Sequence, residues 1–280
     1  FFSFDSNSLF ALFVLDRFLG QERAEIYIGG LFVMFSARAF EFWGYLSEAL
    51  ETGMMQNEAR ETGWQEFFQM VYASPAKVKQ FQQGMIGCSV AQFRAFSKQF
   101  DFRGYQTLVD IGGGTGQLCA YIAQEHAHMK CITTDMPVVQ PIAEECLRTL
   151  WEVSPEQVES RSINFLVDPF PRADMITMGM ILHDWGDTEK FMLIQKAYDA
   201  LPPGGAFVVL ESIIDDDRRE NAHGICMSLH MLLEFGSFGG YDFTHADFNK
   251  WCLSVGFERT EKMHLAGPNS AVIAFKGLGE

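Results

Sequence analysis

Basic residues are scarce in this 280-residue sequence. Lysine and arginine together number 21, against 36 aspartates and glutamates, which gives a formal net charge of −15. Proteins that bind the phosphate backbone of nucleic acids depend on clusters of lysine and arginine. Nucleic acid is therefore a weak candidate partner.

Long apolar runs and paired cysteines are also missing. No uninterrupted apolar stretch approaches the roughly 20 residues that a membrane-spanning helix needs. The six cysteines are scattered without a Cys-x-x-Cys pair, and most lie in apolar runs, which is typical of reduced, buried thiols. The pair His126 and His128 has no cysteine or carboxylate ligand set nearby. We therefore predict a cytoplasmic protein with no membrane segment and no bound metal.

The first residues form an apolar run, Phe1 to Leu19, that starts without methionine. Asp5, Asp16 and Arg17 interrupt the run, so it does not match the apolar core of a signal peptide. We interpret it as the interior of a fold whose beginning is missing from the sequence.

Helical periodicity dominates residues 1–100, and few patterns there are typical of strands. Apolar residues between Phe32 and Leu46 recur at three- and four-residue spacing, and a second apolar face includes Phe67, Phe68 and Val71. Such aromatic faces fit ordinary core, a subunit interface or a substrate lid. We favour core plus interface.

From about residue 105, apolar strands alternate with helices, which predicts an α/β catalytic domain over 101–280 with a doubly wound, mostly parallel sheet. A short turn at Gly267-Pro268-Asn269 joins the last two strands, so we expect them to pair as an antiparallel hairpin. The expected strands are 107–111, 130–134, 163–167, 175–182, 206–213, 259–264 and 271–276, and the expected helices are 117–125, 138–150, 188–201 and 221–235.

A glycine-dense turn, Asp110 to Gly116, ends the first expected strand. Ligands of such sheets bind at the carboxyl ends of the strands, where glycine lets the backbone bend sharply and approach a ligand. A dinucleotide fingerprint would need a glycine where Gln117 stands. The carboxylate of Asp110 would repel a pyrophosphate but suits an ammonium or sulfonium group. The turn therefore favours S-adenosylmethionine over NAD.

Two further acids follow strands at the same expected edge. Asp135 comes after the strand 130–134 and is placed to accept hydrogen bonds from a ribose diol. Asp168 and Pro169 close the expected third strand and would supply a carboxylate and an apolar wall for an adenine. The predicted cofactor-binding residues are Asp110, Gly112, Gly114, Gly116, Asp135, Met136, Asp168 and Pro169.

An imidazole, His183, directly follows the fourth expected strand in the run Leu182 to Asp187. It should emerge at the same sheet edge as the glycine turn, near Glu211 at the end of the next strand. A capping or core histidine is the alternative. A neighbouring carboxylate fixes the tautomer of an imidazole and raises its basicity, which a general base needs. We predict that His183 takes a proton from an acceptor hydroxyl while Glu211 holds the ring, with no metal required.

These motifs resemble those of the class I S-adenosylmethionine-dependent methyltransferases. Within that class they look like the small-molecule O-methyltransferases, which include caffeate-type plant enzymes, acetylserotonin O-methyltransferase and bacterial natural-product enzymes. The likeness covers, in the family's order, Asp110 to Gly116, Thr134 to Pro137, His183 to Asp187, Leu201 to Gly205 and Glu211 to Arg219. The resemblance implies a seven-stranded sheet, methylation of a small aromatic acceptor with S-adenosylhomocysteine as product, and a homodimer.

By this resemblance His183 is the catalytic base, and Glu211 and Asp242 are the two acids that flank it. Many relatives have glutamate where Asp242 stands. Relatives also often carry a lysine or arginine in the strand before the histidine, whereas 178–180 here reads Met-Gly-Met. The helix 221–235 would lie over the acceptor pocket. The expected substrate-binding residues are Met180, Asp184, Met227, His230 and Met231.

Family members usually begin with a winged-helix dimerisation domain, of which only the end fits before Ile28. The helical region is therefore expected to be its remnant plus linker helices. Three alternatives to an O-methyltransferase stay open besides an oxidoreductase: transfer to carbon or nitrogen, another reaction in the same fold, and a non-catalytic cofactor-binding paralogue. An NAD-dependent oxidoreductase is the weakest alternative, because Gln117 breaks the dinucleotide fingerprint.

Overall fold

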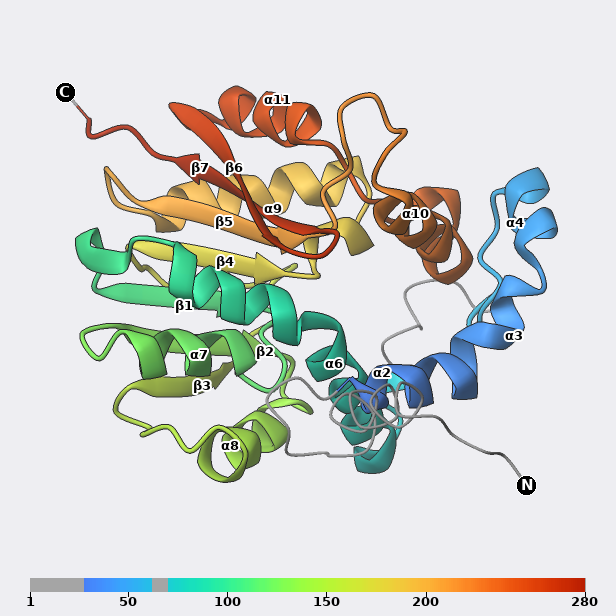
Figure 1. Ribbon diagram of the computed structural model, residues 1–280, viewed down its shortest axis with the longest axis horizontal. Coiled ribbons are helices and arrows are strands. Elements are labelled where there is room, and N and C mark those ends of the chain that lie inside the picture. Colours follow the sequence, from blue (N-terminus) through green and yellow to red (C-terminus); the bar gives the residue numbers. More distant parts are fainter. Residues whose placement is uncertain (1–27, 62–69, 280) are drawn as a thin grey trace, which may run out of the picture.

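The computed structural model describes residues 28–61 and 70–279 (Figure 1). The apolar run 1–19 and the predicted helix face at Phe67 and Phe68 lie outside the described residues. Within the described ranges, no helix combines the length and the apolar character needed to cross a membrane.

A seven-stranded sheet in the order β3-β2-β1-β4-β5-β7-β6 forms the centre of the molecule. The first five strands pair in parallel, and β7 pairs antiparallel with both β5 and β6. The predicted sheet and its antiparallel hairpin are confirmed. The strands are β1 (Thr107–Ile111), β2 (Lys130–Asp135), β3 (Val158–Ser162), β4 (Met175–Gly179), β5 (Ala206–Glu211), β6 (Arg259–Ala266) and β7 (Asn269–Phe275).

Helices cover both faces of the sheet, and each face has its own apolar core. On one face α6 (Pro75–Gln99) packs on β6, β7 and α7 (Gln117–Glu125), α7 packs on β1 and β2, and α8 (Gln140–Thr149) lies beside β3. On the other face α9 (Asp187–Ala200) and α11 (His245–Val255) pack on β4, β5 and β7. Apolar side chains from both faces of the central strands β1, β4, β5 and β7 are therefore buried, as a doubly wound sheet requires.

The remaining helices gather beyond one end of the sheet (Figure 1). Residues Phe42 and Ala49 of the segment before the sheet form a small apolar cluster with Leu233 of α10. The helical region that was predicted to precede the sheet is thus present. These helices are α2 (Gly29–Met34), the π-helix η1 (Phe35–Ala39), α3 (Phe40–Trp43), α4 (Leu46–Thr52) and α10 (Ala222–Phe235); short 3₁₀ turns are η3 (Phe102–Gly104), η4 (Leu182–Asp184) and η5 (Gly236–Phe238).

The predicted third strand, 163–167, is wrong. The edge strand β3 lies five residues earlier and is mostly exposed, so it lacks the continuous apolar pattern of a buried strand. The apolar run forms a turn instead. The side-chain oxygen of Asn164 accepts from the N–H of Leu166, and Asp168 accepts from the N–H of Asn164, which stabilises that turn.

The fourth and fifth strands are shorter than predicted. Strand β4 ends at Gly179 and β5 at Glu211, and Leu182 belongs to the 3₁₀ turn η4. Met180, between β4 and η4, has a φ of 58°. Because this left-handed backbone cannot continue a strand, His183 lies in a short turn and does not follow the strand directly.

Candidate active site

A cavity of about 410 Å³ opens at the carboxyl ends of β1, β2 and β4. Its floor includes the glycine turn after β1, and its walls come from α6, α10 and the helices before the sheet. Parallel strands place the residues that follow them at one edge, so sequence segments far apart meet here.

The glycine turn approaches the cavity with its backbone. Gly112 has a φ of 70°, and a Cβ at this position would collide with the side chain of Ile181. The N–H of Gly114 donates to Oδ2 of Asp135 at 2.9 Å, which ties the turn to the end of β2. Only glycine combines this left-handed backbone with so little free space, and the backbone itself therefore lines the cavity.

Two acids, the buried Asp110 and the partly buried Asp135, stand beside this turn, and both line the cavity. Oδ1 of Asp110 accepts a hydrogen bond from the Thr177 hydroxyl at 2.7 Å, yet burial raises the pKa of Asp110 to about 7. Burial also raises the pKa of Asp135 to about 6, although the N–H groups of Met136 and Gly114 lower it. A positively charged ligand would lower both pKa values, because it favours the ionised carboxylates.

Asp168 and Pro169 do not line the cavity, contrary to the sequence prediction. The carboxylate of Asp168 caps the turn that replaces the expected strand, and its carbonyl oxygen accepts from Lys196. The cavity wall at this point consists of the three residues at the start of the turn: Asn164, Phe165 and Leu166.

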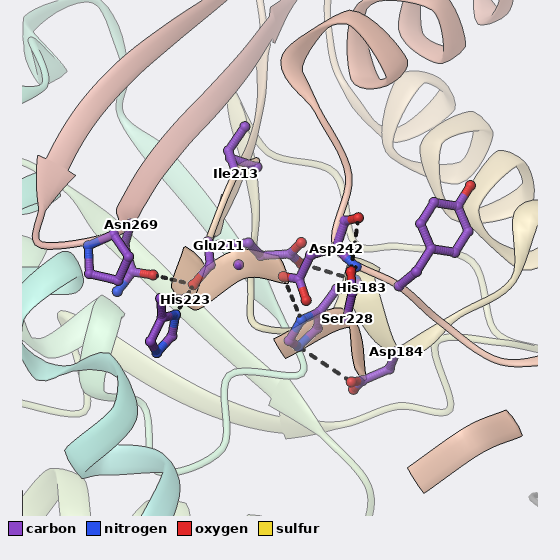
Figure 2. Close-up of polar contacts among 12 residues, drawn as sticks. His183, Asp184, Glu211, Ile213, His223, Ser228, Asp242 and Asn269 are labelled. Atoms are coloured by element: carbon purple, nitrogen blue, oxygen red, sulfur yellow. Dashed lines mark hydrogen bonds and ion pairs between the residues drawn. The ribbon is translucent and has the colours of Figure 1, made fainter. Parts of the chain in front are cut away.

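His183 is 3% exposed and has a carboxyl group on each side (Figure 2). Its Nδ1 lies 3.2 Å from Oδ1 of Asp242, and its Nε2 lies 3.4 Å from Oδ1 of Asp184. Glu211 accepts instead from the backbone N–H of His183 at 3.1 Å. The prediction that Glu211 holds the ring is therefore wrong, because the carboxylate of Asp242 occupies that position.

The carboxylates around His183 make it unusually basic. Burial alone would lower the pKa of an imidazole, but Asp242, Glu211 and Asp184 outweigh burial and raise the pKa of His183 to about 10. Burial raises the pKa of both Glu211 and Asp184 to about 7. Within the described part of the chain, Oε2 of Glu211 and Oδ2 of Asp242 are buried without a hydrogen-bond partner.

The same three residues are close enough to be considered as a metal centre. One ligand atom each of His183, Glu211 and Asp242 lies within 4.8 Å of the others. Two hydrogen bonds account for this closeness. Asp242 contacts the ring of His183, and Glu211 accepts from the backbone N–H of His183. The predicted absence of a metal stays a prediction, with a test given below.

Comparison with known proteins decides the family. The model of the O-methyltransferase domain matches residues 43–258. This chain belongs to the O-methyltransferase family. It is 32% identical over 261 residues to the tetracenomycin polyketide synthesis 8-O-methyl transferase TcmO of Streptomyces glaucescens, covering 93% of this chain and 74% of that protein. It is 28% identical to acetylserotonin O-methyltransferase of Homo sapiens, covering 85% and 68% of the two chains.

Solved structures show the same fold. Human N-acetylserotonin methyltransferase in complex with SAM superposes with a TM-score of 0.85 at 25% identity, covering 94% of this chain and 74% of that one. PigF with SAH gives a TM-score of 0.81 at 21% identity, covering 96% and 84%. The chain is accordingly an S-adenosylmethionine-dependent O-methyltransferase that acts on a small molecule.

The cavity of this O-methyltransferase fits its cofactor. S-adenosylmethionine carries an ammonium and a sulfonium group and no phosphate, and the carboxyls of Asp110 and Asp135 line the cavity beside the glycine turn. A Cβ at Gly114 would meet Oε1 of Gln82, so side chains on the turn would fill the space that a ligand needs. The charge and shape of the floor therefore agree with this cofactor.

The expected cation in the strand before His183 is absent for a physical reason. Met178 is fully buried, and the ring of Phe93 from α6 fills the space next to Gly179, where a side chain would collide with it. Phe93 itself lines the cavity. This O-methyltransferase therefore has an aromatic wall at the place where a charged side chain would enter from β4.

All five predicted substrate-binding residues line the cavity: Met180, Asp184, Met227, His230 and Met231. The ring of His230 stacks on Phe35 with centroids 5.3 Å apart, and its Nε2 lies 3.5 Å from Glu234. Burial lowers the pKa of His230, so this imidazole stays neutral more readily than His183.

Arg38, Tyr72 and Glu234 line the same cavity and were missed by sequence reasoning. Arg38 from η1 donates to both Glu234 and Glu58, with distances of 2.6 Å to Glu234 and 2.7 Å to Glu58. The apolar periodicity between Phe32 and Leu46 predicted this helix, but a single arginine within it carried no signal of its own. Its partners come from segments far away in the sequence.

Proposed function

We propose that this enzyme transfers a methyl group to the hydroxyl of a small aromatic molecule, with His183 as the general base. One observation carries the proposal: a buried imidazole at the cavity has its Nδ1 fixed against Asp242. When Nδ1–H donates to this carboxylate, the lone pair of the neutral ring lies on Nε2, which is 3.4 Å from Oδ1 of Asp184. A neutral ring in this tautomer carries its lone pair on Nε2, which supports the proposed role of His183 as a base.

The basicity of His183 suits a phenolic acceptor. A phenol such as the side chain of tyrosine has a pKa near 10, and the carboxylates around His183 raise the pKa of its imidazole to about 10. Proton transfer between groups of equal pKa has almost no thermodynamic cost. The imidazolium that forms is stabilised by Asp242, Glu211 and Asp184.

We propose that six residues hold the cofactor: Asp110, Gly112, Gly114, Gly116, Asp135 and Met136. S-adenosylmethionine, when bound, supplies a methyl group on a positively charged sulfur. The backbone of the glycine turn gives it room, Asp135 accepts hydrogen bonds from the ribose diol, and Asp110 attracts the positive charge. Asp168 and Pro169 are left out because they lie away from the cavity.

Apolar side chains in the lining of the cavity support an aromatic acceptor. Phe35, Phe93, Met180, Met227 and Met231 provide aromatic and thioether surfaces, which favour flat aromatic ligands. Two relatives support this class through their names, a tetracenomycin 8-O-methyl transferase and a 3-hydroxy-5-methyl-1-naphthoate 3-O-methyltransferase. Asp184 and His230 are proposed to position polar substituents of the acceptor.

A screen of phenols, indoles and naphthols with methyl-labelled S-adenosylmethionine tests the proposal. Wild-type enzyme should methylate a phenolic hydroxyl, and His183→Ala should lose at least about 100-fold in turnover while cofactor affinity changes little. Turnover that survives in His183→Ala at neutral pH would reject the general base. Amines belong in the same screen, because one relative, at 29% identity, is named the N,N-dimethyltransferase OxyT.

We also propose that the enzyme is a homodimer formed through the helices before the sheet, which would be the end of a dimerisation region covering residues 1–100. Among the described residues, the apolar side chains of Phe32, Val33, Phe40 and Leu50 are more than half exposed. Exposed apolar surface of this kind is typical of an interface. Sedimentation equilibrium should give twice the monomer mass, and charged substitutions at Phe40 should restore the monomer.

Localisation in the cytoplasm is a further proposal. All six cysteines are free thiols, and Cys119, Cys131 and Cys252 are buried. Free thiols persist in a reducing compartment. Cell fractionation with an antibody against the protein tests the proposal, and recovery outside the cytoplasmic fraction would reject it.

A further inference from the structure

Lys190 in α9 has a fully buried side chain close to the catalytic cluster. Its Nζ lies 3.4 Å from the centroid of the Tyr241 ring and 5.6 Å from each of the rings of Phe243 and Trp251. It also donates to the carbonyl oxygen of Tyr241 at 3.1 Å. A buried ammonium group is costly unless its surroundings compensate for lost water, so these contacts must hold it strongly.

Tyr241 is held by α9 at two points. Its backbone and ring contact Lys190, and its hydroxyl donates to Oδ1 of Asp187 at 2.6 Å. The next residue is Asp242, whose carboxylate contacts the ring of His183. Any shift of Tyr241 therefore moves the carboxylate that fixes the imidazole.

The segment that carries Asp242 lies directly on the backbone of the catalytic histidine. A Cβ at Gly240 would collide with the carbonyl group of His183 and with the carbonyl carbon of Asp184. On the other side, the hydroxyl of Ser228 from α10 accepts from the N–H of Asp242 at 2.9 Å. The third contact of this segment is the hydrogen bond from the charged side chain of Lys190 in α9 to Tyr241.

Acidic groups outnumber basic groups around Lys190. Four carboxyl groups act on Lys190: Glu211 from β5, Asp187 from α9, Asp242 from its own loop and Asp184 from η4. These carboxylates raise the pKa of Lys190, but burial lowers it to about 8. Lys190 does not line the cavity, so it touches neither acceptor nor cofactor.

We propose that Lys190 is a positioning residue for methyl transfer: by anchoring Tyr241, it holds Asp242 against Nδ1 of His183. The inference rests on the proposed role of His183 as the general base. Lys190 keeps the imidazole in one tautomer and one orientation, and it acts entirely through Asp242.

The test removes the ammonium group and retains the length of the side chain, as Lys190→Met. The first readout needs no acceptor: ¹⁵N NMR of histidine-labelled protein reports whether Nδ1 of His183 is hydrogen-bonded. We expect the Nδ1 signal of K190M to move toward that of D242N, while affinity for S-adenosylmethionine stays within about threefold. Retained affinity shows that K190M is folded. An Nδ1 signal identical to that of the wild type would overturn the proposal.

Kinetics supply the second readout, in a double-mutant cycle with D242N. K190M should lower kcat at its high-pH plateau about tenfold and leave both KM values nearly unchanged. It should also move the acid limb of the pH profile to lower pH, which is the direction expected for D242N. In the D242N background, K190M should change kcat less than about twofold. Full additivity would overturn the proposal, and so would a shift of the acid limb to higher pH, because Lys190 would then act only as a counter-charge.

Lys250→Met is the matched control, because Lys250 lies exposed on the neighbouring helix α11. It should leave the NMR signal, kcat and the pH profile unchanged. The two proposals can fail separately. Turnover that survives His183→Ala rejects the general base, whereas an inactive His183→Ala together with an unchanged K190M rejects only the role of Lys190.

Discussion

Replacing Asp242 by asparagine removes the carboxylate that contacts the ring of His183 and keeps the size of the side chain. Asp242 is 1% exposed, and its Oδ1 lies 3.2 Å from Nδ1 of His183. At an effective dielectric constant of about 20, two unit charges at this separation attract each other by about 5 kcal/mol. Burial offsets part of this energy, and Glu211 and Asp184 remain. We therefore expect D242N to lower the pKa of His183 by about two units.

Two consequences of this lower pKa oppose each other at neutral pH. A base must be neutral to accept a proton, and with the pKa of His183 at about 10, about one imidazole in a thousand is neutral at pH 7. A lower pKa makes the neutral form more common at pH 7. It also makes the base weaker, and the ring loses the partner that fixes its tautomer. A measurement at one pH would therefore mislead.

The full pH dependence of kcat separates the two effects, with labelled S-adenosylmethionine as methyl donor. We expect the acid limb of D242N to lie about two pH units below that of the wild type, and its plateau at high pH to fall about 100-fold. Asp217→Asn is the control, because Asp217 is exposed and should leave the profile unchanged. An acid limb of D242N that coincides with that of the wild type would refute the role of Asp242 in the basicity of His183.

Three further changes test other parts of the site. Asp135→Asn should weaken binding of S-adenosylmethionine at least about tenfold in calorimetry, because its carboxylate ties the glycine turn and faces the cavity; equal affinity would contradict this role. Gly240→Ala should lower the free energy of unfolding by about 2 kcal/mol, measured in urea, because the new Cβ would collide with His183. The same change should also lower kcat. Wild-type values of both quantities would show that the loop moves freely. Prolonged dialysis against EDTA should leave turnover unchanged, and a loss restored by a divalent cation would show that the acids around His183 bind a metal.

Most of the sheet could be predicted because its signals are local. Strands β1, β4, β5 and β7 are almost entirely buried and consist mostly of apolar residues, and Gly-Pro-Asn between β6 and β7 predicts a hairpin. The edge strand β3 could not be found in this way. It buries only Val158 fully, whereas the apolar run after it packs on the core from a turn. An apolar pattern reports burial, and burial does not always mean a strand.

The floor of the site was also within reach of sequence reasoning, and its walls were not. Asp110 and Asp135 lie at the carboxyl ends of β1 and β2, and His183 comes a short turn after β4, so topology alone brings them to one edge. Arg38, Tyr72 and Glu234 come from helices outside the sheet, whose placement depends on packing between distant segments. Helical periodicity can predict that such helices exist, but it does not say where they lie.

The contact between Asp242 and His183 shows where prediction by topology ends. Glu211 ends a strand next to β4, so the sequence favoured it as the partner of the ring. Its carboxylate instead accepts a hydrogen bond from the backbone N–H of His183 in the turn η4. The ring contact falls to Asp242, in a loop that reaches this place because Gly240 has no side chain and because Lys190 holds Tyr241. Our proposal for Lys190 thus links the basicity of His183 to a buried lysine in the helix that begins four residues after it.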